Sequence, residues 1–216
     1  MSAEFPEIQD QTETPLEVVA NVSRVVTKVI DRLTGDRNEV PLMVAAACVE
    51  ALKRFGIESR VMYGQVAWVE VLEDHTIVWA GCWGEYFHFW VATQFGEVVD
   101  LNASVAHRKR GHSEPQIKPL YSPPMLWSKE VPSFYRYQPE GIAELELTQE
   151  EDLKKFELAR KEIREKCGPL QIRGQEPEYP NEPMLVPGRR VLDDTHQSFK
   201  NFERAIGVKG IPQPPF

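Results

Sequence analysis

Apolar residues in the first part of the chain recur at the spacing of two helices. Over residues 15–33 they fall three or four positions apart, which is typical of an amphipathic helix with one buried face. Thr14 and Pro15 predict the cap and first turn of this helix. Residues 41–55 are apolar on almost every side. They therefore predict a second helix that is buried inside the domain.

β-branched and aromatic residues dominate the next part of the chain and predict strands. The predicted strands cover residues 59–72, 74–81, 85–93 and 97–104. Gly64 inside the first strand predicts a bulge or a close approach of another backbone. In an extended segment over residues 85–93, alternation places Tyr86, His88 and Trp90 on one face. We expect an α+β fold, with a central buried helix packed on an antiparallel β-sheet.

Prolines and charged residues mark the second half of the chain. The proline-rich residues 107–140 predict a long irregular segment, which is usually functional or covers a site. Further predicted elements are a last strand over 141–147, a charged helix over 150–166, a proline-rich linker around 176–188 and a short helix over 193–206. The expected organisation is a flexible arm over 1–14, a domain over 15–147 and a helical C-terminal extension with the linker over 148–216.

Composition and charge narrow the classes of protein that need to be considered. The 216 residues suffice for one sizeable domain, and the net charge of −8 argues against a nucleic-acid partner. No run of 18 apolar residues predicts a membrane span, and the acidic start does not resemble a secretory signal. Three cysteines, Cys48, Cys82 and Cys167, form an odd and sparse set. They argue against a disulfide framework and favour a reducing, cytoplasmic location.

Several chemistry-bearing residues follow one another in a fixed order. The stretch LKRFGIESRV over residues 52–61 ends the buried helix, and Gly64 follows it. His88 and Trp90 then form a His-x-Trp motif, and Asp100 comes after a tight turn. This ordered set resembles the transglutaminase-like superfamily, which has the papain-like cysteine-hydrolase fold. The resemblance covers residues 38–104, about a third of the chain.

The resemblance implies a cysteine nucleophile at the start of the central helix, a histidine that takes its proton and an aspartate that orients the histidine. By that comparison His88 is the base and Asp100 the orienting residue. The position of the cysteine falls on Pro41, which Leu42 follows, and neither side chain can act as a nucleophile. The resemblance therefore implies a His–Asp pair without the usual cysteine.

Two cysteines remain candidates for the missing nucleophile. Cys48 lies seven residues beyond Pro41, or ~10 Å along a helix, whereas a base must approach within ~3 Å of the nucleophile. Cys48 is therefore either a buried core residue or, if the helix is displaced, the nucleophile. Cys82, in a glycine-flanked loop, is either a solvent-facing thiol or a nucleophile in a different arrangement. Cys167 has no expected role.

Aromatic residues are dense in the predicted strands. Most must fill the core, and we expect Trp90, Tyr86 and Trp83 to line a cleft beside His88 as binding residues. The alternative for His88 and Asp100 is a hydrogen-bonded pair with a purely structural role.

A metal site is not expected. The available side chains are His75, Cys82, His88, His107 and His112, and their spacing matches no zinc signature. No other cofactor is predicted. The basic run over residues 107–112 is either solvated loop charge or a site for an anionic ligand or acidic partner.

The leading functional hypothesis is a transglutaminase-like domain that retains the His–Asp pair, lacks the cysteine and acts as a non-catalytic or atypical ligand- or peptide-binding protein. The expected partner is a peptide, a protein or a small acyl substrate, with no nucleic acid and no membrane. The alternative is an active cysteine hydrolase or acyltransferase that uses Cys48 or Cys82 with His88 and Asp100. A third hypothesis is a scaffold recognised through its proline-rich segments. Whether the chain is an enzyme stays open at this point.

Overall fold

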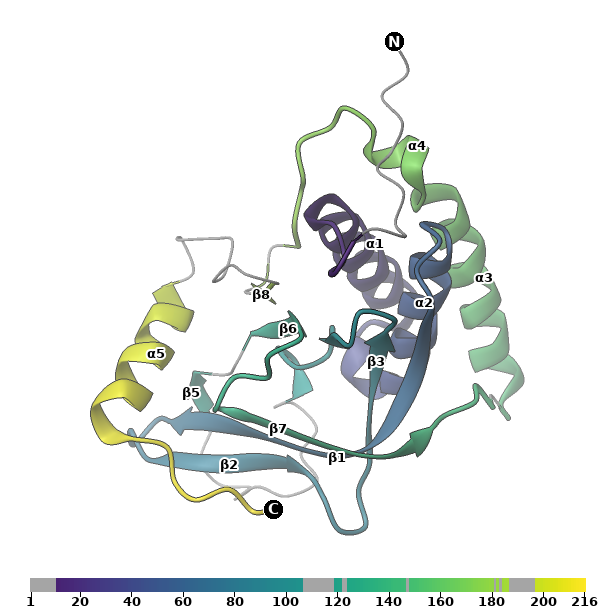
Figure 1. The fold of residues 1–216 in the computed structure, drawn as a ribbon. Coiled ribbons are helices and arrows are strands. Elements are labelled where there is room, and N and C mark those ends of the chain that lie inside the picture. Colours follow the sequence, from purple (N-terminus) through teal and green to yellow (C-terminus); the bar gives the residue numbers. More distant parts are fainter. Residues whose placement is uncertain are drawn as a thin grey trace.

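The structure is a computed structural model that describes residues 11–106, 119–121, 124–146, 148–180, 182, 184–186 and 197–216. Within these residues it is an α+β fold with one curled, mixed sheet (Figure 1). The helices are α1 (Leu16–Thr34), α2 (Pro41–Lys53), α3 (Glu150–Lys166), α4 (Pro169–Ile172) and α5 (Gln197–Lys209), with a 3₁₀ turn η2 (Arg37–Glu39). The strands are β1 (Ser59–Leu72), β2 (Ile77–Cys82), β3 (His88–Thr93), β4 (Val98–Asp100), β5 (Pro119–Tyr121), β6 (Met125–Ser128), β7 (Tyr135–Ile142) and β8 (Met184–Leu185).

Helices α1, α2 and α3 pack together beside the sheet (Figure 1). The buried face of α1 consists mainly of valines, and α2 is buried along most of its length, as the apolar pattern predicted. Helix α3 adds Phe156, Ala159 and Ile163 to the same core. Each fully buried Val or Ile side chain contributes about 1.5–3 kcal/mol, so this three-helix contact is a major source of stability.

Strand β1 is the centre of the sheet. Residues 59–64 pair with β3 and residues 66–71 with β2 along one edge, while β7 pairs along the other edge. The register between β1 and β7 shifts at Gly64, where an added Cβ would lie 2.2 Å from the carbonyl oxygen of Gln138. The predicted bulge and close approach at Gly64 are therefore confirmed.

The sheet departs from the prediction in one pairing. The order β2-β1-β3-β4-β6-β8 is antiparallel except at its end, where β8 pairs parallel to β6. The prediction of a wholly antiparallel sheet was therefore wrong at this edge. A parallel pair requires a long crossover, and the chain between β6 and β8 supplies one that includes α3.

Several predicted boundaries also differ. Strands β5, β6 and β7 lie in or begin in residues 107–140, which were predicted as irregular, and β7 starts six residues before the predicted last strand. Thr14 does not cap α1; its backbone N–H and its hydroxyl donate to the Glu97 carboxylate at 2.9 and 2.6 Å. Most of the predicted arm, residues 1–10, lies outside the described residues. Among the described helices, none combines the length and the apolar character needed to cross a membrane.

Candidate functional site

The candidate site is built on the neighbouring strands β3 and β4. Val91 pairs with Val99 and Ala92 with Val98, across a turn in which Gly96 has a φ of 77°. Because the strands are antiparallel, the start of β3 lies beside the end of β4. This arrangement brings Nε2 of His88 to 2.8 Å from Oδ2 of Asp100. We call these two side chains the His–Asp couple.

The couple is almost completely shielded from solvent: His88 is 5% exposed and Asp100 2%. Asp100 accepts two further hydrogen bonds, from the Tyr137 hydroxyl to Oδ2 at 2.8 Å and from the Asn102 backbone N–H to Oδ1 at 2.9 Å. Burial alone raises the pKa of Asp100, but His88 and the hydrogen bonds outweigh it and the pKa falls below its usual value. Asp100 is therefore a carboxylate that holds the imidazole in one orientation.

Tyr137 is a third member of the site that sequence reasoning missed. Burial, and then the charge of Asp100, raise the pKa of its hydroxyl well above the ordinary value, so that it remains a donor. Trp90 packs edge-on against the Tyr137 ring, with the ring centroids 5.1 Å apart. Within the described part of the chain, Nδ1 of His88 has no hydrogen-bond partner. The imidazole is thus oriented from one side only.

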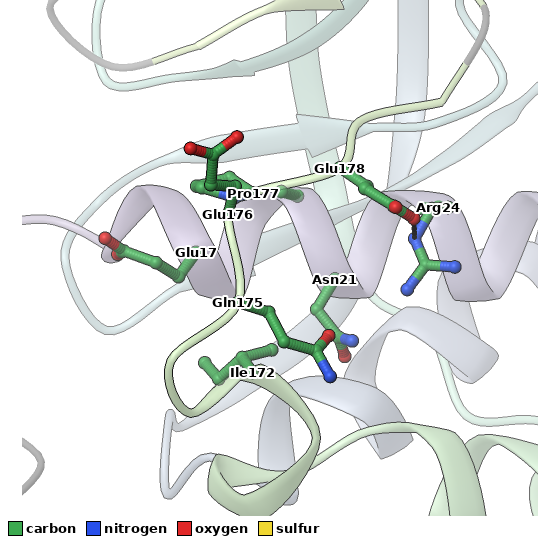
Figure 2. Close-up of a pocket in the computed structure, with 9 residues that line it drawn as sticks. Glu17, Asn21, Arg24, Ile172, Gln175, Glu176, Pro177 and Glu178 are labelled. Atoms are coloured by element: carbon green, nitrogen blue, oxygen red, sulfur yellow. Dashed lines mark ion pairs between the residues drawn. The ribbon is translucent and has the colours of Figure 1, made fainter.

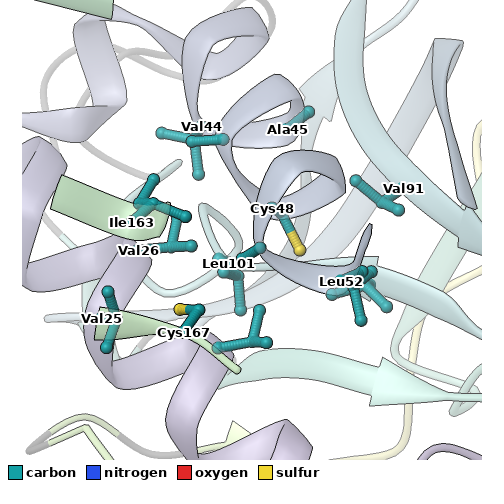
Figure 3. Close-up of a cluster of buried hydrophobic side chains, with 14 of the residues drawn as sticks. Val25, Val26, Val44, Ala45, Cys48, Leu52, Val91, Leu101, Ile163 and Cys167 are labelled. Atoms are coloured by element: carbon teal, nitrogen blue, oxygen red, sulfur yellow. The ribbon is translucent and has the colours of Figure 1, made fainter. Parts of the chain in front are cut away.

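The two buried thiols lie in the apolar core between the helices (Figure 3). Cys48 on α2 is 1% exposed, and burial, with a smaller contribution from Cys167, raises its pKa. Burial raises the pKa of Cys167 to about 12. Neither thiol is hydrogen-bonded to His88. A nucleophilic cysteine needs a lowered pKa, so both thiols have the opposite electrostatic environment.

The space between α2 and the couple is small. Pro41, at the first turn of α2, lines a cavity together with Cys48, Trp90, Asp100 and Asn102. The cavity offers about 10 Å³, which is room for about one water molecule. An acyl substrate does not fit into this space.

A buried arginine fixes the segment that follows Asp100. Arg37 in η2 donates from Nε to the carbonyl of Leu101 at 3.0 Å and from Nη1 to Asp31 at 2.6 Å. Its Nη2 donates to Ser104 at 3.1 Å and pairs with Glu182. Burial lowers the pKa of Arg37, but the two carboxylates outweigh this and raise it. The charged guanidinium therefore connects α1, the residues that follow β4 and the chain near β8. No local pattern in the sequence pointed to it.

Two other hollows lie away from the couple. One, of about 20 Å³, lies between α1 and residues 172–178, where Arg24 and Glu178 form an ion pair at 3.8 Å (Figure 2). It has room for one or two water molecules. A wider hollow of about 510 Å³ is lined by Val49, Lys53 and residues 56–59, at the end of α2 remote from Pro41. None of the residues of the couple lines either hollow.

The predicted binding residues do not share one environment. Trp90 is buried and lines the small cavity. Strand β3 begins only at His88, so Tyr86 and Trp83 lie in the connection from β2. Tyr86 is 49% exposed and Trp83 is half-buried. The adjacent Phe87 is 47% exposed and its ring contacts Tyr63, with centroids 5.9 Å apart.

The remaining predicted features lie partly within and partly outside the residues that the structure describes. Cys82 is the last residue of β2 and is half-buried, and none of the three cysteines forms a disulfide. In the described residues, no three His, Cys, Asp or Glu side chains gather in a way that could hold a metal ion. His107, His112 and the rest of the basic run 107–112 lie outside the described residues.

Comparison with known proteins places this chain in no established family. No family model matches it, and no curated protein matches it. One solved structure, the crystal structure of a structural-genomics target, is similar over 72% of this chain and 78% of its own, at 13% identity and a TM-score of 0.39. A similarity at this level supports no argument about fold or function.

Proposed function

We propose that the chain is a transglutaminase-like domain that lacks thiol chemistry and acts as a non-catalytic binding protein for a peptide or protein segment. The proposal rests on which side chains contact the His–Asp couple. His88 and Asp100 are in contact, but neither buried thiol is hydrogen-bonded to His88. A base and its orienting carboxylate cannot form an acyl-enzyme without a nucleophile.

The family assignment is supported by how the elements meet. Helix α2 is buried and packs against β3 and β1. Its end leads through the turn at Gly56 into β1, and His88 and Asp100 lie on the neighbouring strands β3 and β4. This is the order of elements that the superfamily resemblance implies. The position of the family's cysteine is taken by Pro41.

The binding role is supported by the surface that leads into His88. Because the cavity beside the couple holds about one water, a ligand would lie on the outside of the domain. Phe87 is exposed directly before His88, with Tyr63 in contact with its ring. Aromatic residues are enriched at the cores of protein interfaces, where they contribute apolar area. We define this pair, Tyr63 and Phe87, as the aromatic rim.

The competing hypothesis is an active cysteine hydrolase or acyltransferase that uses Cys48 or Cys82. The burial and raised pKa of Cys48 count against a thiolate at that position. Cys82 lies at the end of β2 rather than on α2, so it would need a different arrangement of the site.

A reducing, cytoplasmic location is part of the same proposal. None of the three cysteines forms a disulfide, and Cys48 and Cys167 are buried among apolar side chains. Free buried cysteines are typical of compartments in which thiols stay reduced.

The catalytic part of the proposal is tested by turnover. Dansylcadaverine incorporation into casein and hydrolysis of p-nitrophenyl acetate are measured with the unaltered chain, with His88→Ala and with Cys48→Ala. We expect all three proteins to match the rate without protein. Turnover that disappears in both variants would contradict the proposal and support the competing hypothesis.

The binding part is tested with a peptide array of defined sequences. The unaltered chain is compared with Phe87→Ala, which shortens the aromatic rim. The matched control is Leu158→Ala, which removes an exposed apolar side chain from α3. We expect Phe87→Ala to lose the peptides that both the unaltered chain and the control retain. No binding by the unaltered chain, or equal binding by all three, would refute the role of the rim.

A further inference from the structure

The six residues after Gly210 lie alongside β2 (Figure 1). Their sequence, IPQPPF, contains three prolines, and they form neither helix nor strand. Proline fixes its own φ near about −65° and has no N–H, so such a segment favours the extended polyproline conformation. That conformation has no internal hydrogen bonds, which leaves its carbonyl oxygens available to a donor.

Two tryptophans contact this segment. The indole Nε1 of Trp79 donates to the carbonyl oxygen of Pro212 at 2.9 Å. The Trp83 ring meets the Phe216 ring edge-on, with centroids 6.4 Å apart. Aromatic side chains are the usual recognition elements for proline-rich peptides.

The pattern of burial along the segment has a period of three. Ile211 and Pro214 are half-buried, whereas Pro212, Gln213 and Pro215 are exposed. Polyproline helix repeats every three residues, so residues 211 and 214 face the same way. Ile211 packs against the apolar cluster beneath it. One face of the segment therefore rests on the protein, as in a bound peptide.

The surface under the segment is built from other parts of the fold. The guanidinium of Arg136 lies 5.6 Å from the centroid of the Trp79 ring and donates to the carbonyl of Tyr135 at 2.9 Å. Arg136 on β7 pairs with Ala67 on β1, and Ala67 pairs with Gly81 on β2. Because Ala67 and Gly81 are small, no large side chain separates Arg136 from the Trp79 ring at this position. These contacts position the Trp79 ring without the segment, and a preformed site loses less freedom on binding.

The segment is also held close to this surface. Phe202 on α5 is buried against Phe134, and Lys209 donates to the backbone carbonyl of His75 in the turn between β1 and β2. Residues 211–216 therefore start beside β2. A short tether gives a ligand an effective concentration of about millimolar.

We propose that Trp79, Trp83 and Arg136 form a docking site for proline-rich peptides in the polyproline conformation, which residues 211–216 of the same chain occupy and thereby block. The site is separate from the His–Asp couple and does not depend on whether the couple is catalytic. An external peptide binds only when it displaces the chain's own segment, so its apparent affinity is reduced by that competition.

The first test measures the fluorescence anisotropy of a labelled IPQPPF peptide. The unaltered chain is compared with a full-length variant that combines Pro212→Ser, Pro214→Ser and Pro215→Ser. The variant lacks its own occupant, so it should bind the peptide at least about tenfold more tightly. Adding Trp79→Phe keeps an aromatic ring but removes the indole N–H, and should weaken binding again by about tenfold. The control peptide IGQGGF should not bind.

Three results would overturn the proposal: equal affinity of the unaltered chain and the triple variant, an affinity that Trp79→Phe does not change, or equal binding of the glycine peptide. The molecular mass from light scattering tests whether the docked segment comes from a second copy of the chain. A dimer formed by the unaltered chain and absent from the triple variant would assign the occupant to a second copy, which overturns the intramolecular arrangement.

A second measurement needs no proline replacement. Amide order parameters of Gln213 and Phe216 are measured by NMR in the unaltered chain and in Trp79→Phe. A docked segment is rigid, so both values should lie near about 0.85 in the unaltered chain and fall below about 0.6 in the variant. Low values already in the unaltered chain, or no change in the variant, would contradict the proposal.

Discussion

Tyr137 donates its hydroxyl hydrogen to Oδ2 of Asp100 at 2.8 Å, the same oxygen that contacts His88. Strand β7 supplies this residue, and β7 pairs with β1 rather than with the strands of the couple. The orientation of the His–Asp couple therefore depends on both edges of the central strand. A site assembled in this way is sensitive to small changes in hydrogen bonding, because its polar groups are buried.

We expect Tyr137→Phe to destabilise the chain by about 1.5–3 kcal/mol, the usual cost of losing a hydrogen bond to a charged group. The ring and its contact with Trp90 remain, so only the donor is lost. Urea denaturation provides the measurement. The matched control is Tyr63→Phe, because the Tyr63 hydroxyl makes no hydrogen bond among the described residues. Equal stability of the two variants would show that the bond to Asp100 contributes nothing.

Asp100→Asn should lower the free energy of unfolding by about 3 kcal/mol at neutral pH. The substitution removes the negative charge of the buried carboxylate that His88 contacts. Glu144→Gln, at an exposed carboxylate, is the control and should change nothing measurable.

The cost of Asp100→Asn should also depend on pH. The pKa of Asp100 is lower in the folded chain than the ordinary value of 3.8, so the unfolded chain takes up the proton first as pH falls. The stabilisation is complete above about pH 5 and is lost as pH falls through the folded pKa. Denaturation of both proteins over a pH series should show their difference shrinking below about pH 4. If the difference in the free energy of unfolding grew as the pH fell, the pKa of Asp100 would not be lowered in the folded chain.

Arg37→Lys should destabilise the chain by about 3 kcal/mol although the charge is kept. A lysine cannot reproduce the separate bonds to Leu101, Asp31 and Ser104, since it lacks the planar fork of the guanidinium. Thermal denaturation compares it with Arg32→Lys, which alters an ion pair with Glu162 at the surface. Surface pairs contribute about 0–1 kcal/mol, so the control should stay close to the unaltered chain.

The elements that rest on local periodicity could be predicted from the sequence. The boundaries of β1 and α3 match the predicted ranges, and α1 differs by one residue at each end. The family resemblance implied the pairing of His88 with Asp100, and the two residues lie on adjacent strands that are close in the chain. Short-range patterns are sufficient for such features because neighbouring residues determine them.

The features that rest on distant partners could not be predicted. Strand β7 contains Pro139 and looked irregular, yet it pairs with β1 across some seventy residues, where the bulge at Gly64 accommodates it. Tyr137 was missed for the same reason, although the alternation of Tyr135 and Tyr137 is a weak strand signal. Thr14 had an obvious local role as a cap, and the buried Glu97 displaced it with two hydrogen bonds. Tertiary contacts overrode the local preference in each case.

The most direct test of the central claim is the rate at which iodoacetamide alkylates Cys48 in the native chain at pH 7.5, resolved by mass spectrometry against a cysteine peptide. The account predicts a rate about 100-fold or more below that of the peptide, because a buried thiol reacts only when the core opens. The denatured chain should react like the peptide. Alkylation of native Cys48 faster than the peptide, and slowed by His88→Ala, would show an activated thiolate and contradict the account.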